Sequence, residues 1–168
     1  MDRPKHVDRP FLTAVQLMRE KVASFLEYPF NVPAISSLHT LELHPSVTFL
    51  VGENGTGKST LLEAIAVALG LNAEGGSRNF NFSTRPSQSA LADYVRLHRT
   101  LRRPRDAWFL RAESFFNVAT EIEALDAQGV GAPRIVDAYG GKSLHEQSHG
   151  EAFFSLFRER FGGGGLYL

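Results

Sequence analysis

The first third of the chain contains several short runs in which apolar residues follow a regular pattern. Residues 11–26 fit either a strand, with alternate positions apolar, or a helix with one apolar face, and the pattern leaves both readings open. Residues 41–44 alternate between apolar and polar, which predicts a short half-exposed strand that ends at Pro45. The run Val47–Val51 consists throughout of residues that are common in strands, which predicts a strand buried on both faces.

The pattern changes to that of a helix at Lys58. Residues Leu61–Leu69 are apolar nearly all round, so we expect a deeply buried helix. Gly70 follows at the position where a glycine commonly ends a helix. The segment therefore predicts a strand, a short loop and a helix in direct succession.

The rest of the chain alternates between helical and extended patterns. Residues 74–88 read as a loop that contains a short strand at Asn79–Phe82, and residues 128–133 read as a glycine-rich turn. The other expected elements are a helix over Ala90–Leu101, a strand at Trp108–Leu110, a helix over Phe115–Leu125 and a helix with an apolar face over Glu151–Phe161. This order predicts an α/β sandwich in one domain, residues 1–168, with residues 72–146 as a helical and loop insertion.

Composition narrows the class of protein without identifying a function. The chain is 43% apolar and 21% charged, its formal net charge is zero, and it has no cysteine. These values are typical of an ordinary globular protein, and they exclude disulfides, thiolate metal sites and thiol nucleophiles. The polar N-terminus lacks the apolar core of a secretory signal, and no run is long enough for a membrane helix, so we expect a cytoplasmic protein.

One segment carries a specific chemical pattern, Gly-x-x-x-x-Gly-Lys-Ser/Thr, the loop that binds nucleotide phosphates. It follows the expected strand Val47–Val51 and opens the expected helix, as this loop requires. The residues that we expect to bind the nucleotide are Gly52, Glu53, Asn54, Gly55, Thr56, Gly57, Lys58, Ser59 and Thr60.

The residue types of this loop match the chemistry of a bound triphosphate. Glycine lets backbone N–H groups turn toward phosphate oxygens, and the start of a helix adds unpaired N–H groups and a positive dipole end. Lys58 is expected to reach the β- and γ-phosphates, and the Ser59 hydroxyl is expected to ligate Mg²⁺. The guanine-reading pattern Asn-Lys-x-Asp is absent from the sequence, so ATP is the expected nucleotide.

The loop resembles that of ATP-binding-cassette-type ATPases, including SMC and RecF heads. Residues 28–35 and 109–116 also resemble a bacterial family of predicted AAA-type ATPases within that group. The resemblance implies a P-loop sandwich that binds ATP and Mg²⁺ and hydrolyses ATP to ADP and phosphate. Two other functions stay open: a nucleotide-dependent interaction module that dimerises with little turnover, and a small-molecule kinase.

Residues 147–151 resemble a degenerate form of the signature Leu-Ser-Gly-Gly-Gln of the same class. The resemblance implies that Ser148, His149, Gly150 and Glu151 contact the nucleotide of a second copy in a homodimer. The same residues also fit a plain helix cap, in which Ser148 caps the helix and Glu151 completes a capping box. The two readings are compatible.

Hydrolysis of this kind needs a second motif, an apolar strand that ends in Asp-Glu. Residues 135–137 have too short an apolar run, and the strand at Trp108–Leu110 is followed by Arg111. The resemblance places the acids after Leu166–Leu168, where the sequence stops. We therefore expect a domain that is incomplete at its C-terminus and hydrolyses ATP slowly.

Several weaker candidates have more than one interpretation. Five arginines in residues 96–105 form either a contact for nucleic acid or another partner, or a solvated helix face, which is favoured. Gln88 is a candidate for the magnesium-linked glutamine. Arg111 and Glu113 either line the nucleotide site or form an ion pair at a strand end. A zinc site at His145 and His149 is disfavoured, because their surroundings do not form a regular helix.

Overall fold

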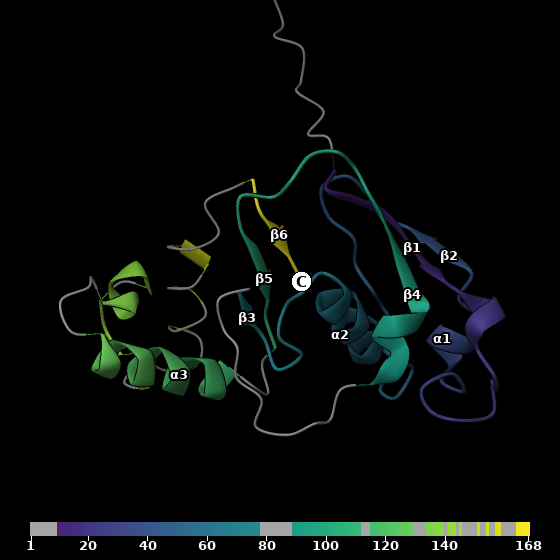
Figure 1. Cartoon of the computed structure of the whole chain (residues 1–168), viewed down its shortest axis with the longest axis horizontal. Coiled ribbons are helices and arrows are strands. Elements are labelled where there is room, and N and C mark those ends of the chain that lie inside the picture. The colour runs from purple at the N-terminus through teal and green to yellow at the C-terminus, as the bar shows by residue number, and fades with distance from the viewer. Residues whose placement is uncertain are drawn as a thin grey trace, which may run out of the picture. The chain divides into compact units, whose positions relative to one another are not determined.

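The computed structural model divides the chain into two compact units (Figure 1). The first unit consists of Met1–Gly70 and Ser87–Pro104, and the second of Leu71–Pro86 and Arg105–Leu168. The residues that the structure describes are 10–77, 89–111, 115–129, 134–139, 141–143, 145, 151, 154, 157–158 and 164–168. Both units contain helices and strands, in agreement with an α/β class.

The first unit contains an antiparallel sheet of three strands in the order β2-β1-β4. These strands are β1 (Leu12–Leu17), β2 (Thr40–Glu42) and β4 (Val95–Arg99). In β1 the apolar residues are buried, whereas Thr13 and Gln16 are half-buried. The strand interpretation of residues 12–17 is therefore confirmed, and β2 confirms the short strand expected before Pro45.

Helix α2 (Lys58–Ala68) follows the glycine-rich loop, as expected. Leu61, Ala64, Ile65 and Ala66 are buried, and Gly70 adopts the left-handed conformation, with φ of 80°, just beyond the helix. A guanidinium nitrogen of Arg99 donates a hydrogen bond to the carbonyl oxygen of Ala68 (2.7 Å), so β4 helps to cap the last turn of α2.

The helix expected over Ala90–Leu101 is wrong. A 3-10 helix covers Ala90–Tyr94, with the Ser89 hydroxyl accepting from the amide of Leu91 (3.1 Å), and β4 follows at once. Val95 and Leu97 lie opposite Leu17 and Val15 of β1 in the antiparallel register. Apolar and polar side chains alternate over residues 95–98, which suits a strand. Their spacing also fits a helix, but pairing with β1 makes them a strand.

The strand expected at Val47–Val51 is also wrong, because no strand is formed there and its side chains are not buried. The exposed fractions of Val47, Phe49 and Val51 are 57%, 83% and 92%. A strand needs a ladder partner, and none pairs with this run among the described residues. Local bonds hold the preceding turn instead: the amides of Ser46 and Val47 both donate to Nδ1 of His44 (3.2 and 3.3 Å).

The second unit has its own three-stranded sheet in the order β3-β5-β6. Strand β5 (Ala107–Phe109) is buried and pairs antiparallel with β3 (Gly76–Ser77) and parallel with β6 (Leu166–Tyr167). This confirms the strand expected around Trp108. The strand expected at Asn79–Phe82 lies outside the described residues.

Helix α3 (Phe115–Gln128) confirms the helix expected over Phe115–Leu125. The carboxylate of Asp126 accepts from the amides of Ile135 and Val136, and this holds the start of the 3-10 helix Ile135–Tyr139. Arg134 immediately precedes that element, and its hydrogen bond to Asp137 (2.7 Å) raises the pKa of Arg134.

The later helix expected over Glu151–Phe161 is described at four residues, and all four are helical. Two of them, Phe154 and Phe157, belong to its expected apolar face and are exposed. Among the described residues, no helix has the length and apolar character needed to cross a membrane.

Candidate functional site

The glycine-rich loop is a turn that closes on its own backbone. The amide and the hydroxyl of Thr56 both donate to the carbonyl oxygen of Glu53 (3.4 and 2.8 Å). Gly55 and Gly57 have φ of 80° and 99°, a conformation that side chains with a Cβ rarely adopt. The two glycines therefore permit the sharp turn that delivers the chain to α2.

The ammonium group of Lys58 lies inside the curve of this loop. Its Nζ donates to the carbonyl oxygens of Gly52 (2.8 Å) and Glu53 (2.6 Å), and the Thr56 hydroxyl lies 3.5 Å away. The same residue begins α2, so a positive side chain and the positive end of a helix dipole meet at one point. This is the arrangement of charge that attracts an anion.

The first turn of α2 also leaves backbone donors for a ligand. The amide of Leu61 donates to the carbonyl oxygen of Gly57 (2.9 Å), which is the first hydrogen bond of the helix. The amides of Lys58, Ser59 and Thr60 precede it, and an α-helix offers no acceptor for such N–H groups. Ser59, the residue after Lys58, is exposed on this turn.

A short helix packs against the glycine-rich loop, and the sequence patterns did not predict this helix. Helix α1 (Pro33–Ser36) begins after Val32, and the amide of Ala34 donates to the carbonyl oxygen of Thr56 (3.0 Å). A Cβ added to Gly57 would lie 2.5 Å from Cγ1 of Val32, so this side chain packs directly against the loop. The one sequence signal was Pro33, since proline is common at the first position of a helix.

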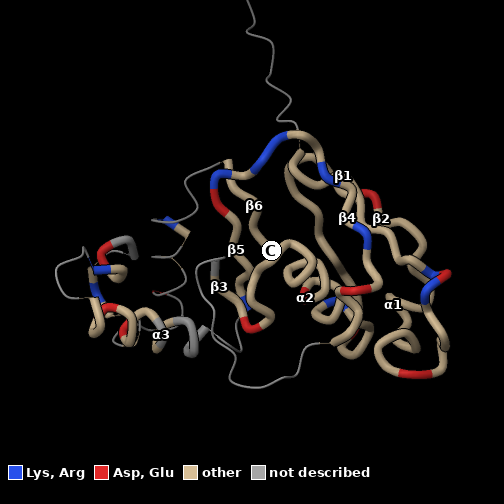
Figure 2. Tube along the Cα trace, in the orientation of Figure 1, with Lys and Arg blue, Asp and Glu red and all other residues tan. Residues whose placement is uncertain are grey.

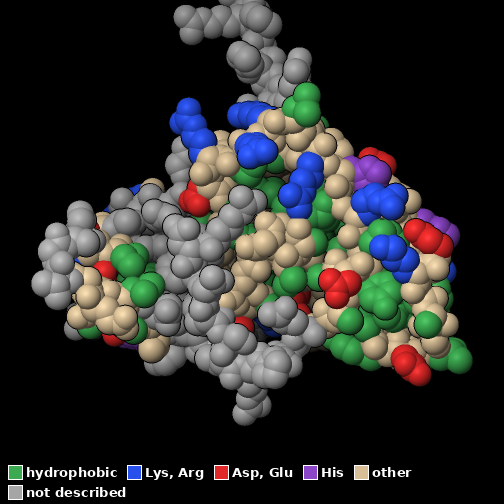
Figure 3. Space-filling model, viewed as in Figure 1, with side chains coloured by type: hydrophobic (Ala, Val, Ile, Leu, Met, Phe, Trp, Pro, Cys, Tyr) green, Lys and Arg blue, Asp and Glu red, His purple; other side chains and the backbone are tan. Residues whose placement is uncertain are grey.

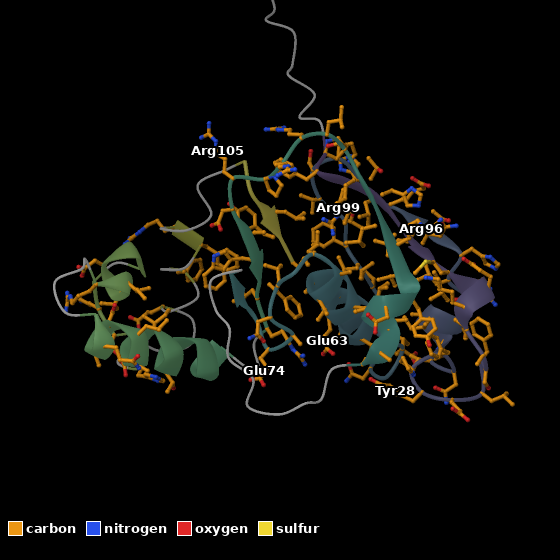
Figure 4. All side chains as sticks on the ribbon, in the orientation of Figure 1. Tyr28, Glu63, Glu74, Arg96, Arg99 and Arg105 are labelled. Carbon is orange, nitrogen blue, oxygen red and sulfur yellow. The ribbon has the colours of Figure 1, made fainter. Side chains whose placement is uncertain are left out.

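The basic cluster at residues 96–105 is not on a helix face. Figure 2 shows Lys and Arg positions along β4 and the loop that follows, and all five arginines of the cluster are exposed. Figure 3 shows basic side chains on this face of the molecule, and Figure 4 labels Arg96, Arg99 and Arg105. Arg99 caps α2, Arg102 lies 4.8 Å from the centroid of the Phe11 ring, and Arg96 contacts the sulfur of Met18 (3.8 Å). These contacts give three of the arginines structural roles within the first unit.

Other candidate residues are only partly described. Arg111 donates to the carbonyl oxygen of Ala73 (3.2 Å) within the second unit, whereas Glu113 and Gln88 lie outside the described residues. The same holds for Ser148, His149 and Gly150, and Glu151 is an exposed helical residue. The described residues contain no group of three His, Asp or Glu side chains placed to hold a metal, and His149 lies outside them.

Comparison with known proteins identifies one relationship. Residues 29–126 match the model of a family described as an AAA domain, and this range covers more than half of the 168 residues. The matched range includes α1, the glycine-rich loop and α2. No curated protein and no solved structure matches the chain.

Proposed function

Because the chain belongs to the AAA domain family of nucleotide-binding ATPases, we propose that it binds ATP with Mg²⁺ on the loop Gly52–Thr60. The observation that carries this proposal is the Lys58 ammonium, held 2.6–2.8 Å from two carbonyl oxygens inside a glycine loop. An incoming phosphate meets this cation, the backbone N–H groups and the start of α2 together.

The residues of the loop have distinct roles in this proposal. Lys58 donates to the β- and γ-phosphates, and the amides at the start of α2 bind the phosphate oxygens. Ser59 suits Mg²⁺ because the ion prefers oxygen ligands and the hydroxyl is exposed beside the loop. Bound Mg²⁺ would neutralise charge on the phosphates.

We further propose, on the resemblance of the loop to ABC-type ATPases, that the family activity is hydrolysis of ATP to ADP and phosphate. The attacking water needs a carboxylate to orient it and accept its proton.

Removal of magnesium tests the role of Ser59. We expect a chelator to weaken ATP binding by at least about tenfold in the unmodified protein, since a charge-assisted contact is lost. In Ser59→Ala the chelator should have much less effect, because the hydroxyl that holds the ion is already gone. Isothermal titration of ATP with and without Mg²⁺ measures both.

Ser59→Thr is the matched control, because the loop pattern accepts either hydroxyl. This variant should keep the dependence on magnesium. If ATP binding depends equally on magnesium in Ser59→Ala and Ser59→Thr, the proposed role of Ser59 as a magnesium ligand is wrong. Failure of the unmodified protein to bind Mg-ATP would contradict the proposed function itself.

A second proposed function is ATP-dependent dimerisation with little turnover. It is favoured by the resemblance of Ser148, His149, Gly150 and Glu151 to the ABC signature. The sequence predicts a helix from Glu151, which is helical in the structure. In a two-fold dimer, Ser148 of one copy would face the γ-phosphate bound by Lys58 of the other. A helix start is suited to that anion.

Ser148→Arg tests this arrangement, because a large side chain there would block the approach of the second copy. We expect the variant to bind ATP as a monomer and to lose the ATP-induced dimer in light scattering. Gln128→Arg, which adds the same charge at an exposed position of α3, should still dimerise. If Ser148→Arg dimerises like the unmodified protein, Ser148 is only a helix cap.

A further inference from the structure

We propose that Arg19 is a positioning residue for the phosphate-binding loop. Its guanidinium group fixes the C-terminal end of α1, and the N-terminal end of α1 holds the loop at Thr56 and Gly57. This inference rests on the proposed binding of ATP at the loop. It adds a residue that lies outside the loop and touches no part of it.

Arg19 binds the end of α1 through two carbonyl groups. One guanidinium nitrogen donates to the carbonyl oxygens of Ser36 (2.7 Å) and Leu38 (3.1 Å). Carbonyls at the end of a helix have no acceptor role within it, and a cation there also interacts favourably with the helix dipole. The half-buried Arg19 therefore caps the C-terminal end of α1.

Aromatic packing and the sheet fix Arg19 itself. Its guanidinium carbon lies 4.2 Å from the centroid of the Phe25 ring, which stacks edge-on against Phe30 (6.4 Å). Phe30 in turn packs against Tyr94 at 4.8 Å, and the carbonyl oxygen of Tyr94 accepts from the amide of Met18 (2.8 Å). Arg19 is thus held against a packed aromatic cluster of the first unit.

The opposite end of α1 contacts the loop directly. The amide of Ala34 donates to Thr56 (3.0 Å), and Val32 fills the space beside Gly57. Helix α1 has only four residues, about 6 Å of rise, and such a helix is not stable without external contacts. The buried side chain of Ile35 and the contacts at the two ends therefore keep it in place.

A shift of α1 would reach the groups that bind phosphate. The Thr56 hydroxyl and the carbonyl of Glu53 share hydrogen bonds with the Lys58 ammonium. Releasing the Arg19 end of α1 would let Thr56 and Gly57 move, so the loop amides would no longer point consistently at the phosphates. The expected result is weaker ATP binding in a protein that is still folded.

The test compares Arg19→Ala with Arg99→Ala. Both variants remove one arginine that donates to a carbonyl at the C-terminal end of a helix, but Arg99 caps the end of α2 that lies away from the loop. We expect Arg19→Ala to raise the dissociation constant of Mg-ATP on the order of tenfold. For Arg99→Ala we expect a change within about twofold.

Hydrogen exchange of the ATP-free protein supplies a second measurement that does not depend on nucleotide. The amide of Ala34, whose hydrogen bond to the carbonyl oxygen of Thr56 joins α1 to the loop, and the amides of Ser36 and Leu38 should exchange faster in Arg19→Ala. The amides of β1 and β4 should be unchanged. Arg19→Lys retains a cation with hydrogen-bond donors and should recover part of the protection. If Arg19→Ala does not fold, Arg19→Lys takes its place in both measurements.

The outcomes separate this inference from the proposed function. Absence of Mg-ATP binding in the unmodified protein contradicts the proposed function, and exchange of the Ala34 amide still tests the link between α1 and the loop. Unchanged exchange in Arg19→Ala, or an equal loss of ATP affinity in Arg19→Ala and Arg99→Ala, would overturn the positioning role of Arg19.

Discussion

Lys58→Ala is expected to abolish tight binding of Mg-ATP, with a dissociation constant at least about tenfold higher. The Lys58 ammonium lies between two loop carbonyls, at the centre of the proposed phosphate site. Charge-assisted contacts to phosphate contribute roughly 1.5–3 kcal/mol, and residues 52–60 contain no other basic side chain to replace Lys58. Isothermal titration with Mg-ATP measures the change.

The same substitution should have little effect on the free energy of unfolding. It releases the carbonyl oxygens of Gly52 and Glu53, but both residues are exposed, so water can replace the lost donor. Lys21→Ala is the control, because it removes an exposed lysine of the first unit outside the loop. Normal ATP affinity in Lys58→Ala would contradict the assignment of the loop.

The sequence predicted those elements that depend on local chemistry. The helix beginning at Lys58, the glycine at its end and the short strand before Pro45 are confirmed. The helix and its terminal glycine depend on residues within one or two turns, where spacing and backbone preference are sufficient. The strand also needs its pairing with β1. The strand reading of residues 11–26 was one of two alternatives, and pairing with β2 and β4 decided between them.

Two wrong predictions concerned strand pairing, which sequence spacing does not determine. Val47–Val51 has the composition of a buried strand, yet no described strand pairs with it. Residues 95–99 have helical spacing, yet they extend the sheet beside β1. Whether an apolar run becomes a strand depends on a partner far away in the sequence.

The candidate site was predicted at the loop but not around it. The pattern of glycines, Lys58 and Ser59 identified the residues that we expect to bind phosphate. It did not indicate that Val32 packs on Gly57, or that Arg19 binds the far end of α1. Those contacts depend on the path of the main chain, and arginine bound to a carbonyl has no sequence pattern of its own.

Gly57→Ala is expected to disturb the loop more than any other single methyl group added to it. The new Cβ would lie 2.5 Å from Cγ1 of Val32, and the residue would have to keep φ of 99°. Left-handed backbone costs about 1–2 kcal/mol for a residue with a Cβ, and overpacking costs about 1–3 kcal/mol more. We expect a lower free energy of unfolding in urea and loss of Mg-ATP binding.

Gly55→Ala separates the two contributions, because its Cβ would meet nothing within 4 Å at φ of 80°. This variant should show only the backbone cost. Val32→Ala combined with Gly57→Ala should recover the overpacking part, which gives a coupling energy of about 1–3 kcal/mol in a double-mutant cycle. The cycle with Gly55→Ala should be additive within about 0.5 kcal/mol, since Val32 does not contact that position. If the free-energy changes of Gly57→Ala and Val32→Ala are also additive, the packing of Val32 against Gly57 has no energetic role.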